Sequence, residues 1–168
     1  MSELEAYGLA VEVPTGWEGR VFRRAEAGQP QASNVAGAAA PPGELTFPVV
    51  HVATVPIPND AADYGSDVVV DLGPDDAFIV LKEFDASDVA QPLFARDGMP
   101  RSLAAEDFDP AALQRQLSGQ AGRQVFFHEN GRAFCLYVVL GSFNRRLQVV
   151  PAVNAVLGGI RIDPVVAE

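Results

Sequence analysis

The residues of this chain best suited to chemistry are one cysteine and two histidines. Cys135 lies inside an apolar run. His51 lies far from it in the sequence, and His128 lies beside the Asn130-Gly131 pair. A Cys/His metal site would need all three to converge, and neither the CxxC nor the HExxH spacing occurs. A Cys–His nucleophilic pair would need a thiolate, whereas the apolar neighbours of Cys135 predict a buried, unreactive thiol. We therefore predict that the protein is not an enzyme and that it has no catalytic residue, no metal site and no cofactor.

The two histidines have structural interpretations. His51 lies in a strand-like run with no second histidine or carboxylate at metal-ligand spacing. We expect it to be buried or at a sheet edge, with its ring satisfied by the backbone. His128 stands beside a predicted turn, and we expect it to face solvent.

Aspartates are densest between residues 60 and 76, but they do not form a calcium loop. The D-x-[DN]-x-[DN]-G pattern is absent, and so are the glycine-rich phosphate loops and the G-x-S-x-G elbow. We predict a solvated acidic surface rather than a cation site. The aspartates are Asp60, Asp63, Asp67, Asp71, Asp75 and Asp76.

The overall charge limits the classes of partner. The formal net charge is −10, which disfavours nucleic acid and anionic membranes and fits either solubility or a basic partner surface. A single cysteine excludes an internal disulfide, the first residues lack the features of a secretory signal, and no apolar stretch reaches the ~20 residues of a membrane helix. We expect a cytoplasmic protein with no nucleic-acid partner and no membrane partner. Lys82 is the only lysine, and the composition suggests a GC-rich genome.

The strongest structural signal is a β-hairpin between Gln124 and Ser142. Two β-rich runs flank Asn130-Gly131, the residue pair that suits a type I′ turn. The second run, 133–140, is apolar on both alternating faces. It therefore predicts a central strand with other elements covering each face.

Other segments predict the elements around this hairpin. An opening hairpin is expected from strands at 9–13 and 18–24, joined by the turn Pro14–Gly16. Asp109 as N-cap, Pro110 in the first turn and Gly119 at the C-terminus predict a helix over 110–118. The further predicted elements are strands at 49–57, 68–72, 77–84 and 160–162, and an amphipathic helix at 149–157.

These elements predict one α+β domain over residues 1–168, with a central antiparallel sheet flanked by helices. The segment 25–43 is rich in alanine, glycine and proline and has no periodicity. It predicts a mobile loop or, as an alternative, a segment that orders on a partner. We expect the core to contain Trp17, Phe134, Tyr137 and Val153.

The order of the elements resembles the PsbP-like family. The resemblance rests on Val-Pro-Thr-Gly-Trp-Glu (Val13 to Glu18), the late hairpin, and a closing helix that precedes Ile160-Arg-Ile162. It implies a PsbP-like sandwich, with a central antiparallel sheet between helices. It also implies mostly non-enzymatic roles: assembly factors, partners of small GTPases, lipoproteins, and chaperones for effectors of bacterial contractile secretion systems. The family has no shared catalytic residues to transfer.

We therefore expect a non-enzymatic protein-binding module, an adaptor or chaperone-like protein serving a secretion or assembly system. Its partner would be another protein, such as a secreted effector or an assembly subunit, and Trp17, Arg145 and Arg146 are the candidate contact residues. Two alternatives remain. One is a small-molecule-binding domain or hydrolase with a pocket between Trp17 and the 25–43 loop. The other is a structural subunit of a larger assembly, with an interface formed by Phe126, Phe127, Phe143 and Val165-Val166.

Overall fold

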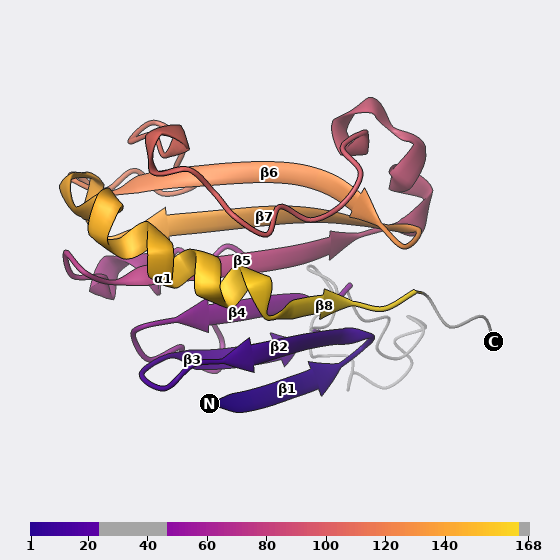
Figure 1. Cartoon of the computed structure of the whole chain (residues 1–168), viewed down its shortest axis with the longest axis horizontal. Helices are drawn as coiled ribbons and strands as arrows, with labels where there is room; N and C mark the ends of the chain where they lie inside the picture. Colours follow the sequence, from indigo (N-terminus) through magenta and orange to yellow (C-terminus); the bar gives the residue numbers. More distant parts are fainter. Residues whose placement is uncertain (24–46, 165–168) are drawn as a thin grey trace, which may run out of the picture.

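The described part of the chain consists of two antiparallel β-sheets and one α-helix (Figure 1). The computed structural model describes residues 1–23 and 47–164, so the predicted mobile loop at 25–43 lies outside the described residues. The larger sheet has the strand order β3-β4-β5-β7-β6, and the smaller sheet has the order β1-β2-β8. In chain order the elements are β1 (Ser2–Ala6), β2 (Leu9–Val13), β3 (Glu18–Phe22), β4 (Val49–Ala53), β5 (Ala77–Phe84), β6 (Ala121–Glu129), β7 (Arg132–Leu140), α1 (Arg146–Gly158) and β8 (Ile160–Ile162). Short 3-10 helices are η2 (Val69–Asp71), η3 (Ala86–Ala90), η4 (Pro92–Phe94), η5 (Ala105–Asp107) and η6 (Phe143–Arg145).

The hairpin expected at the centre of the chain is confirmed. Asn130 and Gly131 have φ angles of 54° and 77°, as a type I′ turn requires. All nine residues of β7 are buried, and this strand pairs with β5 on one side and β6 on the other. The apolar run therefore forms an interior strand with both faces covered.

The prediction of a helix-flanked sheet, and with it a PsbP-like sandwich, is wrong. The described residues contain a single α-helix, α1, of 13 residues. It lies beside the smaller sheet, and the two together cover one face of the larger sheet (Figure 1). The opposite face is covered by irregular chain, including Ile57, Ala61 and the start of η2. The architecture is thus mostly β, with loops in place of a second helical layer.

The helix expected over 110–118 does not form, because long-range hydrogen bonds replace its ladder. Asp109 and Gly122 exchange two backbone hydrogen bonds of 2.9 and 3.0 Å, which attach the chain to the edge of β6. The backbone N–H of Gln114 donates to the Tyr137 hydroxyl over 2.7 Å. The expected capping bond does occur, from the N–H of Ala111 to Oδ1 of Asp109 over 2.7 Å, but it closes only a turn.

The predicted opening hairpin is also wrong, although both of its strands exist. β2 pairs with β1 and β8, whereas β3 pairs with β4, so the turn at Pro14–Trp17 carries the chain from one sheet to the other. The sequence analysis missed β1, whose Ser-Glu-Leu-Glu-Ala composition is weak for a strand. The segment 68–72, expected to be a strand, is the 3-10 helix η2 with its flanks.

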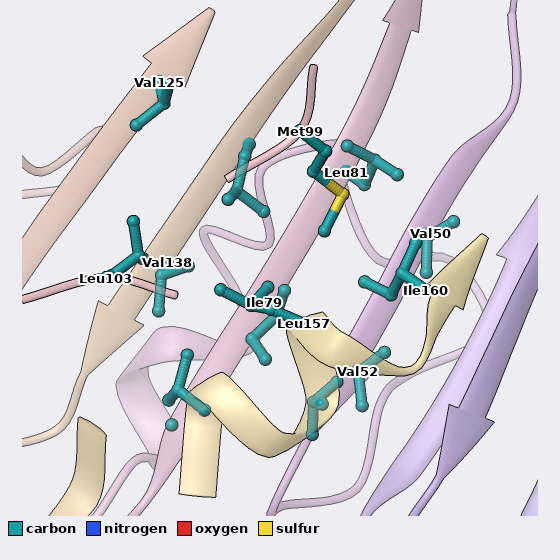
Figure 2. Close-up of a cluster of buried hydrophobic side chains, with 14 of the residues drawn as sticks. Val50, Val52, Ile79, Leu81, Met99, Leu103, Val125, Val138, Leu157 and Ile160 are labelled. Carbon is teal, nitrogen blue, oxygen red and sulfur yellow. The ribbon is translucent and has the colours of Figure 1, made fainter. Parts of the chain in front are cut away.

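One hydrophobic core joins the two sheets and α1. Figure 2 shows valine and leucine side chains of the larger sheet facing Leu157 of α1 and Ile160 of β8. Phe134, Tyr137 and Val153 are buried as expected, while Trp17 is only partly buried and packs against this core. The labelled core residues of the larger sheet are Val50, Val52, Ile79, Leu81, Val125 and Val138.

A buried arginine ties the smaller sheet to the larger one. Arg132, at the start of β7, donates from Nε and Nη2 to the two carboxylate oxygens of Glu83 on β5, over 2.9 and 2.6 Å. Its remaining donors reach the backbone carbonyls of Tyr7 and Gly8 in the β1–β2 turn and of Asp163 after β8, over 2.9 to 3.1 Å. All five guanidinium N–H groups therefore have acceptors.

Candidate functional site

The cysteine and the histidines are placed as structural residues. Cys135 is fully buried on β7, and burial raises the pKa of its thiol to about 11, so it is protonated and weakly nucleophilic at neutral pH. Its Sγ lies 3.4 Å from Nε2 of Gln124, and the Tyr64 side chain is a second hydrogen-bond partner of the thiol. His51 is buried as expected, and its Nε2 donates to the Asp63 carbonyl over 2.7 Å. These groups do not form a nucleophile–base pair.

His128 differs from its prediction. Its side chain is 28% exposed rather than free in solvent, because the 94–98 segment packs along the edge of β6. Nδ1 donates to the Phe94 carbonyl over 2.6 Å, and Nε2 lies 3.6 Å from the Asp97 carboxylate. The imidazole therefore anchors a loop to the sheet edge.

The aspartates between 60 and 76 are dispersed among separate structural contacts. Asp63 pairs with Lys82 over 2.9 Å, Asp76 accepts from the Thr54 hydroxyl over 2.8 Å, and Asp75 pairs with Arg145 over 2.8 Å. Within residues 1–23 and 47–164, no group of three or more His, Cys, Asp or Glu side chains is placed to hold a metal ion. The acidic segment thus connects elements instead of forming a ligand set.

The three predicted contact residues come from two separate parts of the fold. Trp17 lies in the turn between the sheets, and Arg145 and Arg146 lie where η6 runs into α1. In the described part of the chain, no hydrogen bond, ion pair or ring contact joins Trp17 to either arginine. Trp17 and Arg146 are both partly buried, and Trp17 packs against the core, whereas Arg145 is exposed.

We call the start of α1 the helix corner and define it by Phe143, Arg145, Arg146 and Leu147. Arg145 and Leu147 are exposed, whereas Phe143 and Arg146 are partly buried. The Arg146 guanidinium lies 4.0 Å from the centre of the Phe143 ring, and its Nη1 donates to the Phe143 carbonyl over 2.9 Å. The Leu147 side chain is 70% exposed, although α1 buries five other apolar residues. The corner therefore has an exposed apolar residue directly after a stacked cation in the sequence.

The electrostatics of the helix corner do not favour the helix. Arg145 and Arg146 occupy the N-terminal end of α1, where the helix dipole is positive, and the first turn contains no acidic residue. Among the described residues, no side chain caps the first turn. Arg145 has one exposed ion pair, with Asp75, and such pairs contribute little. Helix stability alone does not account for two cations at this position.

Sequence analysis missed Leu147 as a contact residue. The predicted helix began at 149, which left Leu147 in a connecting segment with no assigned face. The available signal was a large apolar residue directly after an Arg-Arg pair on an acidic chain. Of the residues proposed for an assembly interface, Phe127 is fully buried within this chain, and Val165-Val166 lie outside the described residues.

The described residues include no helix with the length and apolar character needed to cross a membrane. No protein-family model, no curated protein and no solved structure matches the chain. The resemblance to the PsbP-like family therefore stays a prediction.

Proposed function

We propose that the protein is a cytoplasmic, non-enzymatic protein-binding module of adaptor or chaperone-like type, and that the helix corner contacts its partner. The observation that carries this proposal is the 70% exposure of Leu147 beside an arginine that stacks on Phe143. A single exposed leucine is ordinary on a protein surface. Aromatic residues and arginine are enriched in protein interfaces, and the Phe143–Arg146 stack directly precedes Leu147 in the chain.

The chemistry of the corner defines the partner surface that would bind it. The two arginines can donate bidentate hydrogen bonds to carboxylates, and the exposed Leu147 side chain can contact an apolar residue of the partner. The rest of the chain is strongly acidic, with a formal net charge of −10. A partner segment with an apolar residue flanked by Asp or Glu fits this corner. The acidic remainder of the surface repels such a segment, so the contact is confined to the corner.

A matched pair of substitutions tests the proposal. Leu147→Asp changes the helix corner, and Leu93→Asp changes another exposed leucine, 56% exposed on η4. Both variants should unfold within about 0.5 kcal/mol of the natural protein, since neither side chain is buried. In affinity capture from the native source at low salt, followed by quantitative mass spectrometry, the natural protein and the Leu93 variant should retain a stoichiometric partner.

The Leu147 variant should lose that partner by about tenfold or more, which corresponds to about 1.4 kcal/mol. A photo-crosslinking residue at position 147 should label the same partner, while one at position 93 should not. Equal retention by both variants, or no stoichiometric partner for the natural protein, would refute the proposal.

A further inference from the structure

β1 has an open backbone edge. It pairs only with β2 among the described strands, and it lies at the lower margin of the molecule in Figure 1. The two-residue Tyr7-Gly8 turn makes Ala6 and Leu9 a hydrogen-bonded pair, so bonding to β2 alternates along β1. The backbone groups of Glu3 and Glu5 therefore point away from β2.

The hydrogen bonds of the neighbouring strand support this assignment. The N–H of Glu12 donates to the Gly159 carbonyl over 3.1 Å, so Glu12 directs its backbone away from its partner Glu3. In the described part of the chain, no backbone hydrogen bond uses the outer N–H or C=O of Glu3 or Glu5. The edge thus offers up to two donors and two acceptors to an added strand.

The outer edges of β8 and β6 are covered. On β8, Arg101 donates to the Ile160 carbonyl, and Asn130 donates to the Ile162 carbonyl over 2.7 Å. On β6, the backbones of Asp97 and Asp109 form bridges to the strand. The β1 edge has no such cover among the described residues, so it differs from β8, the other edge strand of the smaller sheet.

The side chains beside this edge are acidic. Glu3 and Glu5 project from the same face as Glu12, while Leu4 turns toward the core. Glu3 and Glu12 stand directly opposite each other, which is an unfavourable like-charge pair. Arg161 is the cation on this face, and it already pairs with Glu5 over 2.9 Å and with Asp163 over 3.3 Å.

This charge pattern selects between possible strands. A second copy pairing antiparallel about Leu4 would place each Glu3 opposite the Glu5 of its partner, with carboxylates facing one another. A strand with Lys or Arg at alternate positions would instead place cations beside Glu3 and Glu5. Charged residues on an edge strand suppress self-pairing in the same way.

We propose that the β1 edge is a docking edge for a β-strand of another protein that carries basic residues at alternate positions. Main-chain hydrogen bonds to Glu3 and Glu5 supply the pairing, and their carboxylates supply selectivity for the basic strand. The β1 edge is a different surface from the helix corner. It selects a basic segment, whereas the helix corner selects an acidic one.

A synthetic peptide alternating lysine with valine and threonine is the probe. Its binding to the natural protein, measured by fluorescence anisotropy at low salt, should weaken by about tenfold or more for Glu3→Lys/Glu5→Lys. The control Glu106→Lys/Asp107→Lys makes the same change in net charge at exposed residues of η5 and should bind almost as tightly as the natural protein. Equal weakening by both variants would refute the assigned location.

A second peptide tests the backbone component. N-methylation of alternate residues on one edge keeps every charge and removes the donors needed for strand pairing. This peptide should bind at least about tenfold more weakly, and the unmodified peptide should slow amide hydrogen exchange at Glu3 and Glu5. Undiminished binding of the methylated peptide, no binding of either peptide, or a natural protein that dimerises through β1 would overturn the proposal.

Discussion

Replacing Arg132 by methionine should be among the most destabilising single changes in this protein. The side chains of Arg132 and Glu83 are only 5% and 8% exposed, and the arginine meets the carboxylate over 2.6 and 2.9 Å. Methionine removes all five donors but preserves much of the volume. The Glu83 carboxylate is then buried without its cation, and the Tyr7 carbonyl loses its donor, while the Gly8 carbonyl keeps only the N–H of Asp163.

The expected loss is about 3–5 kcal/mol of unfolding free energy, the usual cost of removing one member of a buried ion pair. Stabilities of single domains are about 5–15 kcal/mol, so this is a large share of the total. Urea unfolding followed by circular dichroism measures it. Hydrogen exchange should locate the damage in β1 and β2, since Arg132 holds the turn between these strands.

Two variants separate the ion pair from other effects. Glu83→Leu/Arg132→Met removes both charges, so it should be at least about 2 kcal/mol more stable than the single variant. Arg145→Met makes the same substitution at an exposed pair and should change stability by about 0.5 kcal/mol or less. A loss below about 1 kcal/mol for Arg132→Met, or a double variant no more stable than the single one, would refute the proposed role.

Two further predictions concern buried positions. Burial raises the pKa of the Cys135 thiol from 9.0 to about 11, so the folded state disfavours the thiolate. The free energy of unfolding of the natural protein should therefore fall by up to about 3 kcal/mol as the pH rises from 9 through 11, and that of Cys135→Ala should fall less. If the two unfolding free energies, measured in urea, change in parallel with pH, this prediction is contradicted. Gly65 has φ +63°, and an added Cβ would overlap the Phe78 ring. Gly65→Ala should lower stability by at least about 1 kcal/mol more than Gly98→Ala, where φ is +93° and no atom lies within 4 Å, and equal urea midpoints would exclude the steric effect.

Chemical labelling checks the environment of Cys135 independently. The thiol is inaccessible and protonated in the native state, so a maleimide at neutral pH should react only on unfolding. Labelling rates in increasing urea should follow the unfolding transition. Fast labelling without denaturant would show that β7 is exposed in solution.

Elements specified by adjacent residues were predictable from the sequence. The Asn130-Gly131 turn needs positive φ at both positions, and few other residue pairs tolerate it. The apolar spacing after residue 149 placed α1, although the helix begins three residues earlier. Arg145 is exposed, as long charged side chains usually are, whereas Arg146 is partly buried against the Phe143 ring.

The choice of strand partner was not predictable in the same way. The sequence of β2 and β3 is that of a hairpin, yet each strand pairs in a different sheet, because pairing depends on which apolar face the rest of the chain can cover. The segment after Asp109 has helix punctuation but bonds to β6 and Tyr137 instead.

Local propensity amounts to a few tenths of a kcal/mol per residue, and a buried hydrogen bond or packed side chain outweighs it. The sequence by itself therefore determined the Asn130-Gly131 turn, the apolar strands β5 and β7, and the closing helix. The sheet assignment, the buried Arg132–Glu83 pair, the exposed Leu147 and the open edge of β1 were decided only by tertiary structure, because each depends on residues far apart in the chain.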